Sequence, residues 1–153
     1  MRNFVDKHWA ARHSHLLARQ VVEMLLNESS GQIVMVVLTP ESQERLLQAF
    51  PPVHPEVKAH HLTVAYDPDT AFLERYRAKE GQTVQLSVIG HSADERGQAV
   101  AVAGPSTNMV PHVTISVAPG TDAVYSNELL DKGWEPARPR IPLEGTLVIE
   151  PLD

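Results

Sequence analysis

The sequence predicts an α+β protein whose sheets are largely antiparallel. Runs of β-branched residues alternate with helical stretches in the first half of the chain. Two alternating apolar segments, residues 83–92 and 98–104, flank the turn sequence DERG, which is typical of a β-hairpin. The resulting order of strand, helix, strand, helix and then several strands is characteristic of the α+β class.

The composition is that of an ordinary globular protein. The chain has 153 residues, of which 42% are hydrophobic and 21% are charged, and this length allows one domain with a substantial core. Its net charge of −6 argues against a protein that coats long nucleic acids, because such binding depends on many Lys and Arg contacts to phosphates. We therefore expect a single domain over residues 1–153, without stable bulk nucleic-acid binding.

The residue types also limit the compartment and the chemistry. The chain contains no cysteine, which excludes disulfides, thiolate zinc sites and cysteine nucleophiles. Residues 1–20 mix charges and histidines, unlike a signal peptide, and no run approaches the ~18 apolar residues of a membrane span. These features predict a cytoplasmic protein with no membrane partner.

The first elements follow from apolar periodicity and start signals. Apolar side chains recur at three- and four-residue intervals from about Asn3 to Asn27, which predicts an amphipathic helix within an N-terminal segment of residues 1–30. The continuous run QIVMVVLT, residues 32–39, is typical of a buried strand. Pro40 then marks the start of a short helix over ESQERLLQAF.

The central elements lead into and out of a short strand. The sequence PPVHP, residues 51–55, predicts an extended loop before the strand HLTVAY. The sequence YDPDT turns the chain, and Asp69 or Thr70 is suited to cap a helix that runs through Ala78. The predicted hairpin of residues 83–104 comes next.

The last third of the chain contains a second short strand. The loop GPSTNMVP delivers the strand HVTISV, and a helix over SNELLDKG follows, with Ser126 as its cap and Gly133 at its end. Three prolines in WEPARPRIPLEG, residues 134–145, predict a surface loop, with Trp134 as a cover for the core. The sequence TLVIEPL is then the last strand.

One pattern occurs twice, as KAHHLTVAY at residues 58–66 and as VPHVTISV at residues 110–117. A strand sends alternate side chains to the same face. His61 and Thr63 therefore share one face, while Leu62 and Val64 point toward the core. The same alternation in the second strand pairs His112 with Thr114 on one face.

The repeated pattern suits phosphodiester chemistry if the two strands lie close together. Two imidazoles can act as base and acid near neutral pH, and two hydroxyls can donate hydrogen bonds to anionic oxygens. One histidine would take a proton from the attacking hydroxyl or water, and the other would protonate the departing oxygen. Histidine and threonine are both acceptable in half-buried strands, so a single His-x-Thr sequence would be weak evidence. The interpretation as a catalytic site depends on the repeat.

The double motif resembles those of the 2H phosphoesterase superfamily, over roughly residues 33–149. The resemblance implies a bilobal fold with pseudo-twofold antiparallel sheets lining a central cleft, to which each lobe contributes one motif strand. It also implies that no metal or other cofactor is required. By position, His61 and His112 match the motif histidines, and Thr63 and Thr114 match the hydroxyl residues. The N-terminal helix has no counterpart in the pattern and would be an addition.

Further residues are candidates for substrate binding. Tyr66 is placed to stack on a base at the mouth of the cleft, although packing in the core or on the surface is an alternative. Tyr125 and Ser126 follow the second motif strand and could contact a ligand, whereas Ser126 could instead only cap its helix. His60 should face away from His61, in a structural or surface position.

The other histidines and arginines discussed below are expected to have no functional role. His8, His13 and His15 lack the i, i+4 spacing of a helical zinc pair, so we expect no metal site. Arg138 and Arg140 could neutralise a second phosphate but are expected to be exposed surface residues.

The leading hypothesis is a metal-independent phosphodiesterase that acts on a nucleotide phosphodiester, above all a 2′,3′-cyclic phosphate at an RNA end. Within the same superfamily, the alternative is hydrolysis of cyclic di- or trinucleotide defence signals. The alternative from another class is a nonenzymatic module that binds an anionic nucleotide. The sequence leaves open which histidine is the base, and it leaves open the oligomeric state.

Overall fold

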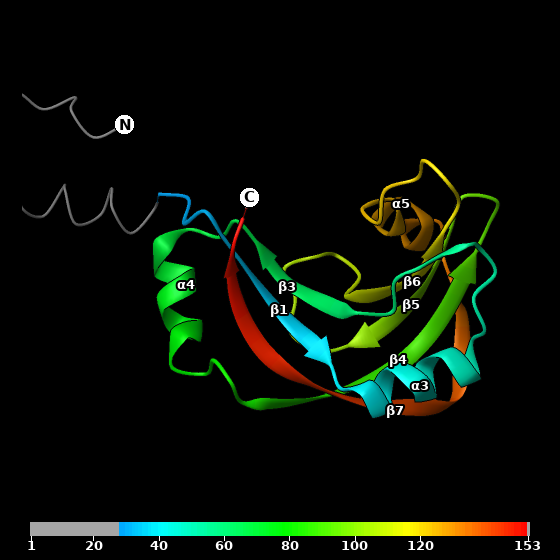
Figure 1. The fold of residues 1–153 in the computed structure, drawn as a ribbon, viewed down its shortest axis with the longest axis horizontal. Helices are drawn as coiled ribbons and strands as arrows, with labels where there is room; N and C mark the ends of the chain where they lie inside the picture. Colours follow the sequence, from blue (N-terminus) through cyan, green and yellow to red (C-terminus); the bar gives the residue numbers. More distant parts are fainter. Residues whose placement is uncertain (1–27, 153) are drawn as a thin grey trace, which may run out of the picture.

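The computed structural model describes residues 28–152, so the expected N-terminal helix and His8, His13 and His15 lie outside the described residues. Between residues 28 and 152, no helix combines the length and the apolar character that crossing a membrane requires. The elements, labelled as in Figure 1, are β1 (Gln32–Leu38), α3 (Pro40–Ala49), β2 (Glu56–Val57), β3 (His61–Tyr66), α4 (Thr70–Arg77), β4 (Thr83–Ala93), β5 (Gly97–Ala103), β6 (His112–Val117), α5 (Tyr125–Asp131) and β7 (Glu135–Pro151).

The strands of the described region form one sheet in the order β2-β6-β3-β1-β7-β4-β5, and β5 also pairs with β6. This extra pairing closes six of the seven strands into a barrel, while β2 is a short addition on β6. Each strand pair in this sheet is antiparallel. The predicted α+β class with antiparallel pairing is therefore confirmed, whereas the two-lobed arrangement is not confirmed by this single closed sheet.

The core fills the barrel. Every barrel strand contributes buried apolar side chains to one cluster, which Leu46 of α3 and Leu73 of α4 join. The barrel contribution consists of Val34, Val36, Leu38, Leu62, Val64, Leu86, Val88, Val100, Val102, Val113, Ile115, Leu143 and Leu147. Strand alternation then turns the residues between these positions to the outer face. The predicted inward orientation of Leu62 and Val64 is confirmed.

Two predicted helix starts are confirmed by their caps. The Ser42 amide donates to Thr39 Oγ1 over 3.2 Å, with Pro40 at the first turn of α3. The Phe72 amide donates to Asp69 Oδ1 over 2.8 Å, so Asp69 caps α4. Such side-chain oxygens satisfy amides that have no partner inside the helix.

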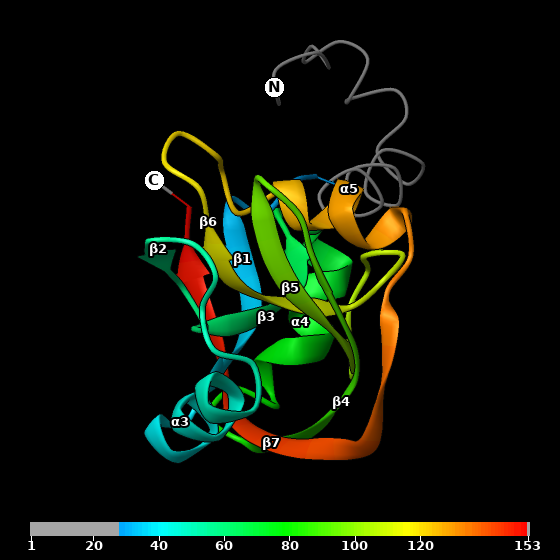
Figure 2. The same cartoon turned by 90° about the vertical axis from the view of Figure 1, so that its right-hand side faces the viewer.

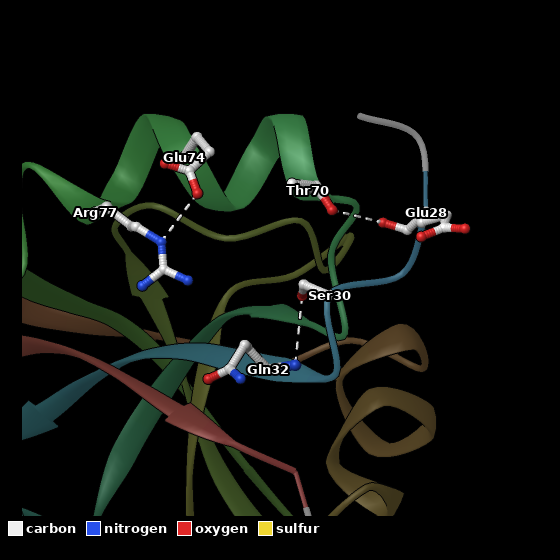
Figure 3. Close-up of polar contacts among 6 residues, drawn as sticks. All are labelled: Glu28, Ser30, Gln32, Thr70, Glu74 and Arg77. Carbon is white, nitrogen blue, oxygen red and sulfur yellow. Dashed lines mark hydrogen bonds and ion pairs between the residues drawn. The ribbon is translucent and has the colours of Figure 1, made fainter. Parts of the chain in front are cut away.

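Polar contacts tie the chain before β1 to the start of α4 (Figure 3). The Thr70 amide and hydroxyl both donate to the Glu28 carbonyl, over 2.9 and 3.3 Å. Further along α4, Arg77 pairs with Glu74 over 3.0 Å, one turn apart. On the other side of the connection, Ser30 Oγ accepts from the Gln32 amide over 3.3 Å as β1 begins. The contacts of Thr70 and Ser30 fix the entry of the chain into the barrel.

The prediction of a surface loop over residues 134–145 is wrong, because β7 runs continuously from Glu135 to Pro151. The first part of β7 pairs with β4 alone, and only the part from Gly145 onward also pairs with β1. A proline has no backbone amide hydrogen to donate. At a strand edge that faces no other strand, this donor is not needed. The register also shifts between Pro136 and Ile141, where four residues of β7 lie opposite one of β4. This bulge absorbs the proline between them.

Helix α5 covers part of the outer face of the barrel (Figure 2). Its Tyr125, Leu129 and Leu130 form a second buried cluster with Ala99 and Ala101 of β5. Since β5 pairs with β6, this packing sets α5 beside the second motif strand. The outer face of β3 and β6 then borders the start of α5.

Gly145 offers a test of barrel closure, because β1 and β4 both pair with it. A β-carbon at Gly145 would lie 2.7 Å from the Val37 carbonyl oxygen, which the paired backbone cannot move easily. We expect Gly145→Ala to lower the free energy of unfolding by about 1–3 kcal/mol, as overpacking does. Urea denaturation followed by circular dichroism measures the change.

The matched control is Gly104→Ala, whose β-carbon would meet the Leu86 Cδ2 atom at 2.5 Å. That atom ends a side chain that can rotate, so the destabilisation should be smaller. Equal losses in the two variants would contradict the special role assigned to the backbone contact at Gly145.

Candidate active site

The two motif strands are neighbours in the barrel. Leu62 of β3 pairs with Val113 of β6 in antiparallel register. In this register His61 lies across from Thr114, and Thr63 lies across from His112. Each histidine thus has a threonine of the other strand opposite it, on the outer face of the barrel.

The four motif side chains share one pocket with a volume of about 640 Å³. The residues that line it are Ile33, Lys58, His60, His61, Thr63, Tyr66, Asn108, His112, Thr114, Ala123, Val124 and Asn127. Lys58 is the one Lys or Arg among these described lining residues, and no carboxylate is among them. The pocket therefore suits a ligand with little negative charge, such as one phosphodiester.

Two loops form opposite ends of the pocket. At one end, Ser106 Oγ donates to the Thr63 carbonyl and the Thr107 amide donates to the Val64 carbonyl, each over 2.8 Å. These bonds hold Asn108 beside the end of β3. At the other end, Thr114 Oγ1 donates to the Ala123 carbonyl over 3.4 Å. The pocket is thus a trough across the strand pair, with one wall from each loop.

The ring of His112 is fixed by a hydrogen bond to the backbone just before β6. Its Nδ1 lies 2.8 Å from the Val110 carbonyl oxygen, which can only accept, so Nδ1 carries a proton and donates. In the neutral ring, Nε2 then holds the lone pair. Burial lowers the pKa of His112, and the bond to Val110 opposes this shift. The neutral ring is ready to take up a proton at Nε2.

His61 has a different partner, the ring of His60. The two Nδ1 atoms are 3.0 Å apart, and the rings meet edge to face at an interplanar angle of 80°. Burial, followed by the charges of His60 and His112, lowers the pKa of His61 from 6.5 to about 4. His61 is consequently neutral at neutral pH in the free protein.

The expectation that His60 faces away from the site is wrong, because His60 lines the same pocket. Alternation applies only within a regular strand, and β3 begins at His61. The preceding Ala59 has a φ of 48°, in the left-handed region. This local twist turns His60 back toward the pocket.

The hydroxyl of Thr114 contacts a serine of α5 that lies behind it. Thr114 Oγ1 lies 2.7 Å from Ser126 Oγ, and Ser126 is 2% exposed. The prediction that Ser126 caps its helix is wrong, since α5 starts after Val124 without a side-chain cap. Ser126 is also absent from the pocket lining, so the structure places it behind Thr114 rather than at the surface.

The two tyrosine candidates differ in position. Tyr66 lines the pocket and is 70% exposed. Tyr125 is 6% exposed and does not line it; its hydroxyl donates to Asp94 Oδ2 over 2.5 Å, and the Arg96 guanidinium lies 4.3 Å from its ring. Tyr125 therefore anchors α5 to the β4–β5 turn. Arg138 and Arg140 are exposed on β7, outside the pocket lining.

Several lining residues escaped the sequence interpretation. Lys58 and His60 directly precede the first motif, Asn108 precedes the second, and Val124 and Asn127 follow it. The sequence feature that could have identified them is their position in the segments just before and after the motif strands. Among the described residues, no three histidine or acidic side chains are grouped so as to hold a metal ion.

Comparison with protein-family models and with curated protein sequences finds no match for this chain. The resemblance to 2H phosphoesterases therefore depends on the two motifs and on the pocket they share.

The depressed pKa of His61 can be measured directly. We expect its ring signals in NMR to titrate near pH 4 in the free protein, and to shift to higher pH when inorganic phosphate supplies a neighbouring negative charge. His112→Asn removes a neighbouring positive charge and should also raise the pKa of His61, while the Asn amide can still donate to the Val110 carbonyl. Titration of His61 at its ordinary pKa in the folded wild-type protein would contradict the described burial.

Proposed function

We propose that the protein is a metal-independent phosphodiesterase of the 2H type, which hydrolyses a nucleotide phosphodiester, above all a 2′,3′-cyclic phosphate at an RNA end. The observation that carries the proposal is the Leu62–Val113 register, with His61 and His112 in one pocket and a threonine opposite each. Two imidazoles and two hydroxyls are the groups that such a reaction needs from the protein.

The roles of the histidines follow from their hydrogen bonds. His112 has its Nε2 lone pair available and acts as the base that removes a proton from water. The water oxygen bonds to phosphorus as the bond to one ribose oxygen breaks. His61 protonates that departing oxygen from Nε2. Thr63 donates a hydrogen bond to a nonbridging oxygen as its charge increases, and Thr114 does the same when its hydroxyl proton turns away from the Ala123 carbonyl.

The two-lobed, pseudo-twofold arrangement is part of the same proposal. Its support is local: a twofold rotation that exchanges β3 and β6 about the Leu62–Val113 pair would exchange His61 with His112 and Thr63 with Thr114. Each strand would then be the motif strand of one lobe.

The size and charge of the pocket favour a short or terminal substrate. A volume of about 640 Å³ accommodates a nucleotide rather than a long duplex, and Lys58 is the single Lys or Arg of the described lining. A cyclic di- or trinucleotide is the second candidate substrate, favoured by the exposed apolar surfaces of Tyr66 and Val124 in the pocket lining. The ring of Tyr66 could stack on one base, and the side chain of Val124 could pack against another.

Substitution of the histidines tests the function. We expect turnover of a nucleoside 2′,3′-cyclic phosphate in EDTA, and a fall in kcat of roughly 10²–10⁴ for His61→Asn and for His112→Asn, the usual contribution of an acid or base. The control His54→Gln changes a histidine outside the pocket, whose Nε2 contacts the Asp94 carbonyl, and should keep wild-type turnover. Full activity in both motif variants, or loss of wild-type activity in EDTA, would disprove the two-histidine mechanism.

The same assay separates the alternatives. Turnover of a cyclic dinucleotide in preference to the cyclic mononucleotide would support the second substrate class. Calorimetric binding of these compounds without any turnover would instead establish a nonenzymatic binding module.

The pH dependence gives a further test. The reaction needs His112 neutral and a proton for the departing oxygen on the side of His61, so kcat/KM falls at low pH as His112 gains a proton and at high pH as the proton for the departing oxygen is lost. Because the pKa values of both histidines are lowered in the free protein, kcat/KM should be highest below the ordinary histidine pKa of about 6.5. The bound phosphate raises both pKa values, so the kcat maximum should lie at higher pH. A kcat/KM that is constant between pH 4 and 8 would be incompatible with this scheme.

A further inference from the structure

We propose that His60 is a positioning residue that delivers a proton to His61, so that the two rings work as a relay to the departing oxygen. This inference rests on the proposed function and extends it to a residue outside the repeated motif. Its basis is the close approach of two Nδ1 atoms inside the pocket, at 3.0 Å.

A hydrogen bond between two Nδ1 atoms requires one proton between them. If His61 holds this proton, its Nε2 in the neutral ring is a lone pair and cannot serve as an acid. If His60 holds it, neutral His61 carries its proton on Nε2, ready for donation. The identity of the Nδ1 donor therefore decides what His61 can do.

The contrast with His112 makes the arrangement asymmetric. The Nδ1 of His112 faces a carbonyl, which never donates, so the neutral His112 ring is restricted to the tautomer of a base. The Nδ1 of His61 faces a ring nitrogen that can donate. Two otherwise equivalent motif histidines thereby receive different roles from their neighbours.

His60 is the better member of the pair to hold a positive charge. His60 is exposed, whereas His61 is only partly exposed, and burial disfavours the charged form. The other titratable or charged side chains of the described lining are Lys58, Tyr66 and His112. None of these is a carboxylate, so the phosphate of the substrate provides the negative charge beside His60.

Two linked proton transfers carry a proton to the departing oxygen. Before the reaction, His60 is cationic with protons on both nitrogens, and His61 is neutral with its proton on Nε2. His61 gives the Nε2 proton to the departing ribose oxygen as the phosphorus–oxygen bond breaks, and its Nδ1 takes the proton from His60. Afterwards both rings are neutral, and one proton has moved to the product alcohol.

Leaving-group dependence tests the relay. We expect His60→Phe to lower kcat about tenfold to a hundredfold on a nucleoside 2′,3′-cyclic phosphate, whose alkoxide leaving group needs a proton. On the p-nitrophenyl ester of the same nucleotide, whose leaving group departs without protonation, kcat should change little.

His60→Asn is the matched variant. The Asn amide can donate near the position of Nδ1 but cannot release a proton, so it should preserve KM and the His61 tautomer while showing the same loss of kcat on the cyclic phosphate. Equal losses on both substrates in the two variants would reveal a merely structural role and overturn the relay.

NMR of the imidazole nitrogens separates failure of the relay from failure of the proposed function. The relay requires His61 to carry its proton on Nε2 in the wild-type protein and in His60→Asn. A proton on Nδ1 of His61 overturns the relay, whether or not the protein is active. Absence of wild-type turnover on every substrate instead rejects the proposed function.

Discussion

The closure of the barrel depends on the short antiparallel contact between β3 and β6. Strand β6 also pairs with β5, so this contact joins the two ends of an otherwise open sheet. Leu62 and Val113 meet there, and both are fully buried. Burial of such a side chain contributes about 1.5–3 kcal/mol. The hydrophobic force that seals the core therefore also sets the relative positions of the two histidines on the opposite face.

The same arrangement determines the electrostatics of the pocket. Burial disfavours positive charge on His61 and on His112, and the charges of His60 and His112 further lower the pKa of His61. A bound phosphate would reverse this balance, because its negative charge compensates the protonated imidazoles. The lowered pKa values favour neutral His61 and His112 in the free protein, and the ligand itself would bring the charge that makes an acid available.

Much of this arrangement was predictable, because it depends on local rules. Alternation correctly turned Leu62 and Val64 into the core, and side-chain chemistry correctly limited the cap of α4 to Asp69 or Thr70, of which Asp69 is the one observed. The errors concern tertiary constraints. Prolines of residues 134–145 join a strand because, before Gly145, one edge of this strand pairs with no other strand of the described region. Ser126 turns toward Thr114 because α5 packs on β5. His60 departs from alternation because Ala59 adopts a positive φ, which no residue pattern indicated.

Because Tyr125 anchors α5, the floor and one wall of the pocket are held in place by different contacts. The floor belongs to barrel strands whose inner faces are locked in the core, whereas one wall belongs to a helix attached through Asp94 on the far side. Changes at exposed wall positions such as Val124 and Asn127 leave both the floor and the anchor untouched. The ligand preference of the proposed site can therefore drift during evolution, or be redesigned in the laboratory, while His61 and His112 keep their places.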